Sequence, residues 1–571
     1  MVDVDRSLVG RVFSRESVIP LGATLLLVYL TAMPLAVLLM SSLQVEVAPN
    51  ETVFSLDNFA AVFGESATYT TFRNSIVFAT GSTLLSFAIA TLLAWIVART
   101  DAPLGSLFVP LAVVPLILPG VLEAIAWIFL LTPRSGYLNV ILESVFNLES
   151  SPFDIYSMPG LIWVQALGSI SLAFLLMLAA FTSMDPSLEE ASLTSGAGRW
   201  ATARKVTLPL MRPAALSVLL ILFVRALEAT ETPLLIGLPG DIRVYTSEIF
   251  LAYRDFPPDY GRAAALSVIL LILAGVGVGL YVRALRDRSA YQVVSGKAFR
   301  PRRIQLGKWR WAAGGVLLSY LFIVVVMPLS ILVWASLLPF FAAPSLEMLQ
   351  RISLDNYEAV FARDKFFTAL QNSATLAVVA PTVVMALTAI IAWIVYRTRY
   401  RVAGALDFLA FVPIAIPGLV LGTALISFYV SNPVPIYGTI WMLLLAYTTK
   451  FLPFGMRAAT GSIAQIHREL EEAAAMSSAT WWQTFRRVTF PLLRPGLAAG
   501  WVYISIITIK EFSTSVLLAS SDSQVLSLLL FELFTAGQHV QVAAVGIVMI
   551  LLLLVIVVVF RGLVGRIGLQ V

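Results

Sequence analysis

Twelve stretches of about twenty mostly apolar residues recur along this chain, and they constrain its fold more than any other feature of the sequence. A helix needs about 20 such residues to cross the hydrocarbon core of a bilayer. The stretches lie near residues 18–43, 72–98, 104–132, 158–182, 207–236, 262–284, 309–338, 370–396, 403–430, 436–460, 489–519 and 541–562. The sequence therefore predicts an all-α polytopic membrane protein with about 12 spans.

The composition agrees with this fold class. Only 12% of the 571 residues are charged, whereas an average soluble domain has about 25%. A soluble enzyme or a nucleic-acid-binding protein is therefore disfavoured, although the net charge is +5. The chain has no cysteine and two histidines, His467 and His539. Disulfides, thiolate metal sites and a cysteine nucleophile are excluded, and we expect no metal site.

Basic residues are concentrated in alternate loops between the predicted spans. They include Arg6, Arg11 and Arg15 before the first span, Arg99 in the second loop, Arg199, Arg204 and Lys205 in the fourth, Arg397, Arg399 and Arg401 in the eighth, and Arg468, Arg486 and Arg487 in the tenth. Because Lys and Arg favour cytoplasmic loops, both termini are predicted to be cytoplasmic. The most basic segment, 283–310, is interpreted as an orientation signal that also contacts lipid headgroups; a dedicated regulatory site is the alternative.

The two halves of the chain resemble each other. Asn58-Phe59-Ala60-Ala61-Val62-Phe63 matches Asn356-Tyr357-Glu358-Ala359-Val360-Phe361 at an offset of 298, and later matches have an offset of 282. Each repeat holds six spans, and an even number returns the chain to its starting side. The repeats therefore share one topology, which predicts a pseudo-twofold axis along the membrane normal. The expected division is a first domain at 1–284, a cytoplasmic linker at 285–308 and a second domain at 309–571.

One motif occurs in the fourth and the tenth loop with identical spacing. The first copy is Glu190-Ala191-Ser192, three residues, Gly196, nine residues, Val206-Thr207-Leu208-Pro209; the second is Glu472-Ala473-Ala474, three residues, Ser478, nine residues, Val488-Thr489-Phe490-Pro491. This motif resembles the "EAA" signature of ABC importer permeases. The first copy departs from it at Ser192 and Val206, and the second at Ser478 and Phe490. The chain is thus similar to a fused permease with two tandem six-helix type I ABC importer transmembrane domains.

The resemblance implies that the loops at 185–206 and 467–488 couple the permease to ATPase subunits. The expected coupling residues are Glu189, Glu190, Ala191, Ser192, Gly196 and Pro209, with Glu471, Glu472, Ala473, Ala474, Ser478 and Pro491 in the second copy. The alternative is that both loops are ordinary amphipathic helices that stabilise the bundle. The chain has no phosphate-binding loop of the Gly-x-x-x-x-Gly-Lys-Ser/Thr type, so it is not expected to be an enzyme or to bind a cofactor.

The same resemblance implies the partners and the location. We expect two copies of a cytoplasmic ABC ATPase, which use ATP and Mg²⁺, an extracytoplasmic substrate-binding protein, membrane lipid and no nucleic acid. The expected location is the cytoplasmic (inner) membrane of a bacterium or archaeon.

Charged residues inside spans are the remaining clue to the cargo, because each is costly at membrane depth. The fifth span has Arg225, Glu228 and Glu231, and the eleventh has Lys510 and Glu511. One interpretation is that these acids line a path for a cation. The other is that Arg225–Glu228, three residues apart on one helical face, and Lys510 with nearby acids are structural pairs near a gate.

The residues around these charges make the resemblance to importer permeases more specific. The segments 225–240 and 510–518 are similar to the corresponding parts of iron(III) importer permeases. This likeness implies ferric iron as cargo, delivered by the binding protein and moved by alternating access. Thiamine, a polyamine or a phosphonate are alternative cargoes. A secondary transporter without an ATPase is the alternative class, and the parallel repeat argues against it.

Overall fold

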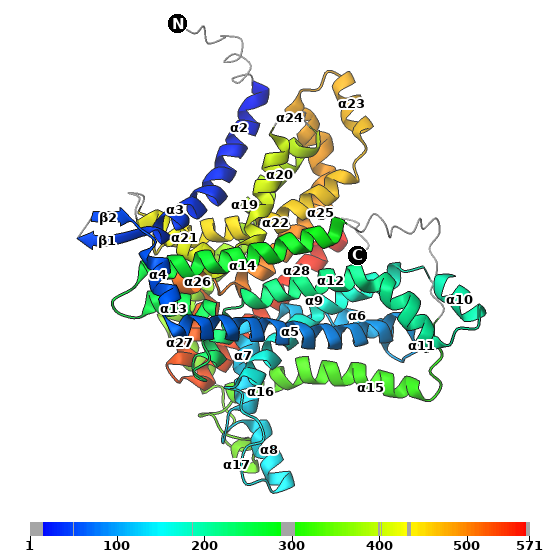
Figure 1. Ribbon diagram of the computed structural model, residues 1–571, viewed down its shortest axis with the longest axis vertical. Coiled ribbons are helices and arrows are strands. Elements are labelled where there is room, and N and C mark those ends of the chain that lie inside the picture. The colour runs from blue at the N-terminus through cyan, green and yellow to red at the C-terminus, as the bar shows by residue number, and fades with distance from the viewer. Residues whose placement is uncertain are drawn as a thin grey trace.

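The computed structural model of this protein describes residues 15–48, 51–185, 187–286, 303–397, 400, 402–430 and 435–566, and it is almost entirely helical (Figure 1). The first half begins with α2 (Arg15–Leu27), η1 (Val28–Ala32), α3 (Met33–Ser42), β1 (Gln44–Ala48), β2 (Glu51–Phe54), α4 (Asp57–Gly64) and α5 (Ser66–Arg99). It continues with α6 (Gly105–Leu111), η2 (Val114–Ile117), α7 (Gly120–Leu131), α8 (Tyr137–Phe146) and α9 (Met158–Ser183). It ends with α10 (Ser187–Thr194), α11 (Arg199–Thr202), η3 (Ala203–Thr207), α12 (Leu208–Leu227), η4 (Pro233–Gly237), α13 (Tyr245–Arg254) and α14 (Tyr260–Arg286).

The second half repeats this order. Its elements are α15 (Trp309–Leu321), η6 (Phe322–Val326), α16 (Met327–Ser336), α17 (Leu346–Leu349), α18 (Asp355–Phe361), α19 (Asp364–Arg397), α20 (Ala403–Phe411), η7 (Val412–Ala415) and α21 (Gly418–Val430). They continue with α22 (Ile440–Ala464), α23 (Arg468–Met476), α24 (Trp481–Thr484), η8 (Phe485–Thr489), α25 (Phe490–Lys510), α26 (Ser515–Leu518), α27 (Leu526–Thr535) and α28 (His539–Arg566). An antiparallel hairpin of β1 and β2 is the one sheet in the described residues. Most of the predicted linker at 285–308 lies outside the described residues.

The described helices account for the predicted spans with three differences. Nine helices are long and apolar enough to cross a membrane, and two bent helix pairs raise that number to eleven among the described residues. The predicted span at 436–460 corresponds to α22. This helix has 25 residues, enough to cross a bilayer, but it contains Lys450 and Arg457 and is less apolar than the others.

The predicted spans at 104–132 and 403–430 are not continuous helices. The chain bends by 95° between η2 and α7 and by 110° between η7 and α21. Pro119 and Pro417 stand at these bends, and the residues before them, Leu118 and Ile416, are extended. Proline pushes the preceding residue out of the helical region, which explains both breaks. The repeated pairs Pro119-Gly120 and Pro417-Gly418 are the sequence signal of these breaks.

The predicted spans at 207–236 and 489–519 are also interrupted. Helix α12 ends at Leu227, and η4 starts only at Pro233. Helix α25 ends at Lys510, and α26 starts at Ser515. The intervening segments hold charged residues. Together with the two bends, they make four interruptions of the spans, and each supplies non-helical backbone inside the bundle, where protein rather than lipid surrounds it.

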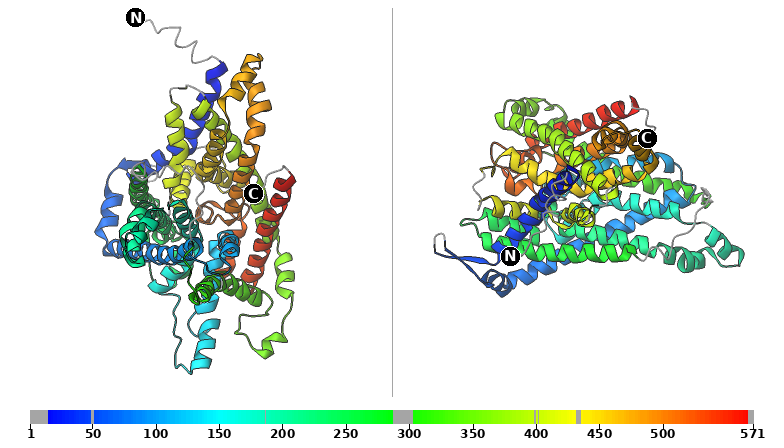
Figure 2. Two further views of the ribbon diagram at one scale, coloured as in Figure 1. Left: turned by 90° about the vertical axis from the view of Figure 1, so that its right-hand side faces the viewer. Right: turned by 90° about the horizontal axis from the view of Figure 1, so that it is seen from above.

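The first span of each half packs on the other half as well as on its own. Helix α3 packs on α21 and α14, and α16 packs on α7 and α28. Tyr29 in η1 shares a hydrogen bond of 2.5 Å with Tyr429 in α21, and Tyr320 in α15 shares one of 3.0 Å with Ser171 in α9. In Figures 1 and 2, α15 accordingly lies along the helices of the first half, and α2 lies along those of the second half. The two halves are therefore interlocked.

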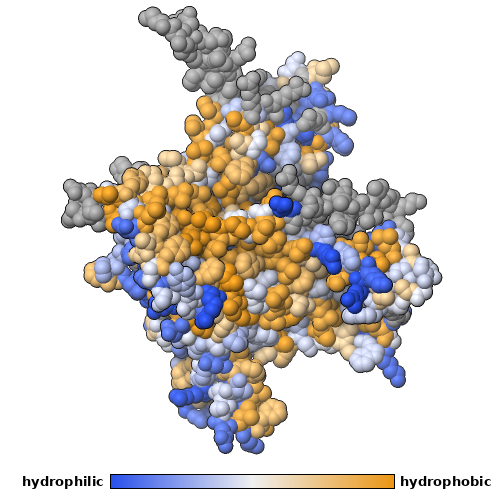
Figure 3. Space-filling view, viewed as in Figure 1, coloured by the Kyte–Doolittle hydropathy of each residue, from blue (hydrophilic) through white to orange (hydrophobic). Residues whose placement is uncertain are grey.

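The surface has the polarity of a membrane protein. Apolar side chains cover the broad middle of the face in Figure 3, and hydrophilic ones are concentrated toward α23 and the tip near α8. Leu84, Leu280 and Val558 are among the apolar residues exposed on the long helices. A soluble protein rarely exposes so large an apolar surface, and a bilayer explains it.

Candidate functional site

Both predicted coupling loops fold as a short helix, a tight turn and a second short helical segment. Helices α10 and α23 lie at the outer ends of the molecule, away from α8 and the β hairpin (Figure 1). Gly196 ends α10 with a φ of +84°, and Ser478 ends α23 with a φ of +59°. The amide of Ala197 donates to the carbonyl of Ser192, and that of Ala479 to Ala474, both at 3.1 Å. These bonds form the Schellman type of helix end, so Ser478 takes the same turn as the glycine.

In the first loop, Glu189 attaches the coupling helix to the membrane bundle. Its carboxylate lies 3.3 Å from the guanidinium of Arg99, at the end of α5, and accepts a hydrogen bond of 2.6 Å from the hydroxyl of Thr207. The Arg99 side chain is only 4% exposed. A buried guanidinium needs a partner charge, so this pair fixes α10 relative to α5 and to the start of α12.

The second loop repeats this attachment. Glu471 lies 3.3 Å from Arg397, at the end of α19, and accepts a hydrogen bond of 2.9 Å from Thr489. Arg397 also donates to the carbonyls of Ile463 and Ile466, at the end of α22. Both halves therefore use an Arg–Glu–Thr cluster at equivalent positions.

The remaining coupling residues differ in their exposure. Glu190, Ala191, Glu472 and Ala473 are exposed, whereas Ser192 and Ala474 are half-buried. Ser192 shares a hydrogen bond of 2.9 Å with Thr202. Pro209 and Pro491 stand in the first turns of α12 and α25. Large apolar side chains surround the exposed glutamates: Leu188, Leu193, Trp200, Leu470 and Met476. Trp200 is 81% exposed and Met476 88%, so each loop presents an apolar and acidic surface that the described part of the chain leaves uncovered.

The second group of candidate residues lies where the spans are interrupted. Glu511, which is 9% exposed, forms an ion pair of 2.7 Å with Lys450 of α22. Glu511 also accepts from the amide of Thr514 at 2.9 Å. Glu228 lies within electrostatic range of Lys450, Arg225, Glu511 and Glu231. The two halves thus bring their charges together.

Lys510 connects the halves directly. Its ammonium group donates to the carbonyl of Leu116 at 2.5 Å, in η2, just before the bend of the first half. It also lies within electrostatic range of Arg225, Glu123 and Glu231. The Oε1 atom of the buried Glu123 has no hydrogen-bond partner among the described residues. Together Glu123, Arg225, Glu228, Glu231, Lys450, Lys510 and Glu511 form what we call the central charge cluster.

Part of this geometry was predictable from the sequence. The residues predicted for the path all belong to the central charge cluster. However, the described residues include no ion pair between Arg225 and Glu228, and Lys450 rather than Lys510 pairs with Glu511. Lys450 was not among the predicted residues, although a lysine within an apolar stretch is a signal in itself. The roles of Arg99 and Arg397, which end equivalent spans, were not predicted either.

The central charge cluster is not a preformed metal site. Among the described residues, no three His, Asp or Glu side chains lie close enough together to hold a metal ion. The cluster instead combines carboxylates with ammonium groups at short range.

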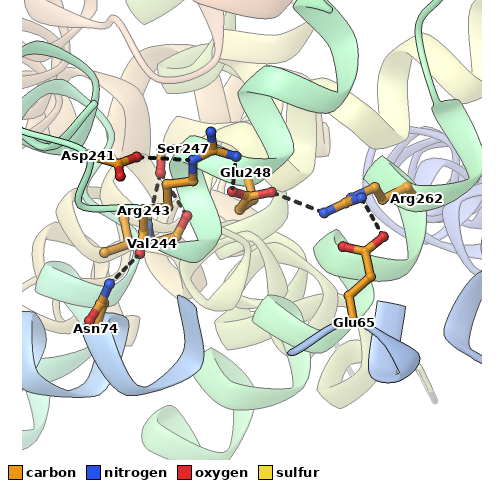
Figure 4. Close-up of polar contacts among 8 residues, drawn as sticks. All are labelled: Glu65, Asn74, Asp241, Arg243, Val244, Ser247, Glu248 and Arg262. Carbon is orange, nitrogen blue, oxygen red and sulfur yellow. Dashed lines mark hydrogen bonds and ion pairs between the residues drawn. The ribbon is translucent and has the colours of Figure 1, made fainter. Parts of the chain in front are cut away.

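A third polar network lies at the far end of the first half, between α5, α13 and α14 (Figure 4). Arg262 contacts Glu65 at 2.8 Å and Glu248 at 3.2 Å. Glu248 also contacts Arg243 at 3.3 Å, and Asn74 donates to the backbone carbonyl of Arg243. These contacts hold the short helix α13, which follows the interrupted fifth span, against its neighbours.

Comparison with known proteins supports these observations. The family described as "binding-protein-dependent transport system inner membrane component" matches this chain twice, at residues 87–290 and 385–568. The ferric transport system permease protein FbpB of Actinobacillus pleuropneumoniae is 27% identical over 490 residues, which are 85% of this chain and 69% of that protein.

Two further proteins are similar. The putative ferric transport system permease protein FbpB 1 of Haemophilus influenzae is 27% identical over 435 residues, 75% of this chain and 66% of that protein. The chain thus spans about two thirds of the length of this relative. A solved bacterial ABC transporter involved in the import of the acidic polysaccharide alginate has 19% identity and a TM-score of 0.37, and the match covers 44% of this chain and 92% of that chain.

Proposed function

We propose that this chain, which belongs to the family of binding-protein-dependent transport system inner membrane components, forms the complete translocation path of an ATP-driven importer of ferric iron. The chain is a multi-pass permease with two copies of the family's domain, so it is a transport subunit and not a catalytic one. The similarity to ferric transport permeases over 85% of the chain is the observation that supports the cargo most strongly.

The central charge cluster supports a cationic cargo. It contains the four carboxylates Glu123, Glu228, Glu231 and Glu511, at the interruptions of spans from both halves. Carboxylate oxygens suit a hard cation such as Fe³⁺, and charged groups inside a membrane protein generally mark a pathway. In this proposal the binding protein captures iron outside, and the cluster only guides it through the membrane.

The exposed faces of α10 and α23 support docking of an ATPase on each half. On each face, an outward-facing glutamate, Glu190 or Glu472, lies among exposed apolar side chains. The inward glutamates, Glu189 and Glu471, would pass movement of the helix to α5 and α19 through their arginine partners. In this proposal two copies of an ABC ATPase use ATP and Mg²⁺, both termini are cytoplasmic, and the halves alternate between outward and inward access. The bends at Pro119 and Pro417 would act as gate elements.

Reconstitution tests the cargo. The chain, its co-purifying ATPase and its binding protein are placed in proteoliposomes, and ATP hydrolysis is measured with ferric-loaded binding protein. We expect ferric iron to stimulate hydrolysis, while thiamine and spermidine do not. Stimulation by either of these two and not by iron would overturn the proposal.

Two charge reversals test the docking surface. In Glu190→Arg with Glu472→Arg, we expect loss of ATPase co-purification or of stimulated hydrolysis. A control variant, Glu143→Arg on α8, should behave like the wild type because it lies at the opposite end of the molecule. Normal coupling in the double variant would contradict ATPase docking at these helices.

A further inference from the structure

The end of α5, where the first coupling helix is anchored, is paired with a segment from far along the chain. Residues 304–306, which precede α15, lie beside it, and we call them the strap. The amide of Ile304 donates to the carbonyl of Arg99 at 2.7 Å, and the carbonyl of Ile304 accepts from the amide of Asp101 at 3.2 Å. Thr100 and Ile304 are thus paired as in a parallel sheet.

The side chain of Asp101 adds a third bond to this pairing. Its Oδ1 atom accepts from the amide of Leu306 at 2.9 Å. The carbonyl of Leu306 in turn accepts from the amide of Trp309 at 3.1 Å, the first residue of α15. The last carbonyls of a helix have no partner within the helix. The strap supplies one to the carbonyl of Arg99 and connects the end of α5 to the start of α15.

Helix α15 also contacts the same loop from the side. It packs on α5 and α6, and a Cβ atom on Gly314 would lie 2.8 Å from the Cγ atom of Pro103. Because a proline ring cannot rotate away from its backbone, the loop between α5 and α6 would have to shift. The adjacent Gly315 has nothing within 4 Å of its Cβ position. Of these two glycines, only Gly314 therefore fixes the distance between α15 and this loop.

The side chain of Arg99 depends on this support of its backbone. Its Nη1 atom pairs with Glu189, but its Nε and Nη2 atoms have no hydrogen-bond partner among the described residues. The equivalent Arg397 is held differently, because its Nη2 atom donates to the carbonyls of Ile463 and Ile466 at the end of α22. The second anchor is thus fixed through its side chain, whereas the first is fixed through its backbone.

The sequence shows that the second half cannot repeat the contact of Asp101. At the offset of 298, the counterpart of Asp101 is Arg399. A guanidinium has only donors, so it cannot accept a bond from a backbone amide. The two coupling anchors therefore differ in construction, although the Arg–Glu–Thr clusters above them are equivalent.

We infer that Asp101 and the strap are positioning elements of the first coupling loop: they hold the end of α5 so that Arg99 meets Glu189 and α10 keeps its orientation. Because the strap continues into α15, the second half of the chain takes part in positioning the first coupling helix. The role in coupling rests on the proposed function, since it takes α10 as a contact of the ATPase. Loss of the strap should loosen α10 and leave α23 unchanged.

Spin labels test this difference in the purified chain, without ATPase or binding protein. The chain has no cysteine, and Ser187→Cys on α10 and Glu469→Cys on α23 give labels at exposed positions that are equivalent at the offset of 282. Asp101→Ala and Leu306→Pro each remove the bond between Asp101 and Leu306. Either change should increase the mobile fraction of the label on α10 by about threefold, and the label on α23 should not respond.

Matched variants separate this contact from a general loss of stability. Asp101→Asn keeps the accepting oxygen and should resemble the wild type. Gln305→Pro should do so too, because Gln305 is exposed and its amide takes part in no hydrogen bond within the described part of the chain. Asp101→Ala combined with Leu306→Pro should be no more mobile than either single variant, because both remove the same bond.

A separate pair of variants approaches the loop from α15. Gly314→Ala should also mobilise the label on α10, and Gly315→Ala should not. The inference is overturned if Asp101→Ala and Leu306→Pro leave the label on α10 unchanged, or if they mobilise the labels on α10 and α23 equally. Equal mobility in Asp101→Asn and Asp101→Ala would likewise contradict it.

Hydrolysis by the reconstituted complex tests the role in coupling. With ferric-loaded binding protein, Asp101→Ala should lower the stimulated rate of ATP hydrolysis by about threefold, and Asp101→Asn should restore it. A wild-type rate in Asp101→Ala, together with a mobile α10, would show that the strap has no role in coupling. The proposed function fails separately, namely when ferric-loaded binding protein does not stimulate the wild type.

Discussion

At the scale of single residues, the coupling loops show how two neighbouring glutamates acquire different roles. Glu189 faces Arg99 and Thr207, and Glu190 faces outward. We expect Glu189→Gln to weaken the attachment of α10 by about 1–3 kcal/mol, because a charge-assisted contact of a nearly buried arginine is lost. Amide hydrogen exchange in α10 should become correspondingly faster.

Glu190→Gln is the matched control for this prediction. Its side chain is exposed, and exposed substitutions have little effect on stability. Exchange in α10 should therefore stay at the wild-type rate. Equal acceleration in both variants would mean that Glu189 has no anchoring role.

The turn residues give a second prediction. Gly196 and Gly198 both have open space where a Cβ would lie, but only Gly196 has a positive φ. Gly196→Ala should therefore cost about 1–2 kcal/mol at the helix end, and Gly198→Ala should cost little. Exchange of the Ala197 amide, which donates to Ser192, measures this cost. The reverse change, Ser478→Gly, should slow exchange of the Ala479 amide; faster exchange there would contradict the turn described.

The sequence predicted these residues only in part. The spacing of the repeated motif identified both loops. It did not distinguish Glu189 from Glu190, because the orientation of an eight-residue helix depends on its tertiary partners. Those partners, Arg99 and Thr207, are 90 residues before Glu189 and 18 after it, and no local pattern connects them.

At the scale of elements, the bends at Pro119 and Pro417 determine where the bundle holds charge. Each bend is followed by a glycine that packs against a charged side chain. We expect Gly418→Ala to lower the initial rate of ATP-dependent uptake by about tenfold, because it displaces Lys450 from its buried ion pair with Glu511. Gly404→Ala is the control, because a Cβ there would meet nothing within 4 Å. Unchanged uptake in Gly418→Ala would show that the bend and the ion pair are independent.

The elements themselves were largely predictable. Long apolar stretches predicted the spans, since the bilayer sets their length, and the paired proline–glycine positions indicated the breaks. The interruptions after Leu227 and Lys510 were not predicted, because apolar residues continue on both sides of them. Both interruptions hold charged residues, and the bend glycines pack within their own halves, Gly120 against Glu231 and Gly418 against Lys450.

At the scale of the whole molecule, the alternation of basic loops predicts that both coupling loops lie in the cytoplasm. The natural absence of cysteine makes this directly testable. In sealed right-side-out vesicles, a membrane-impermeant maleimide should label Ser144→Cys on α8 and should leave Ser187→Cys on α10 unlabelled. Labelling of Ser187→Cys in intact vesicles would reverse the orientation.

The exchange of first spans between the halves could not be predicted. The repeat established that both halves have one topology, but hydrophobic stretches do not specify which helix packs on which. Contacts such as Tyr29 with Tyr429 join residues 400 positions apart. The halves are also joined near the charge cluster, where Lys510 of the second half donates to the carbonyl of Leu116 in the first.

The most direct test of the central claim is ATP-dependent accumulation of radioactive ferric iron in proteoliposomes that contain this chain, its ATPase and its binding protein. Iron should accumulate in the lumen when ATP is supplied to the ATPase side, and accumulation should be lost in Glu190→Arg with Glu472→Arg. Vesicles that hydrolyse ATP but accumulate no iron, or that accumulate iron equally without ATP, would contradict an ATP-driven iron permease.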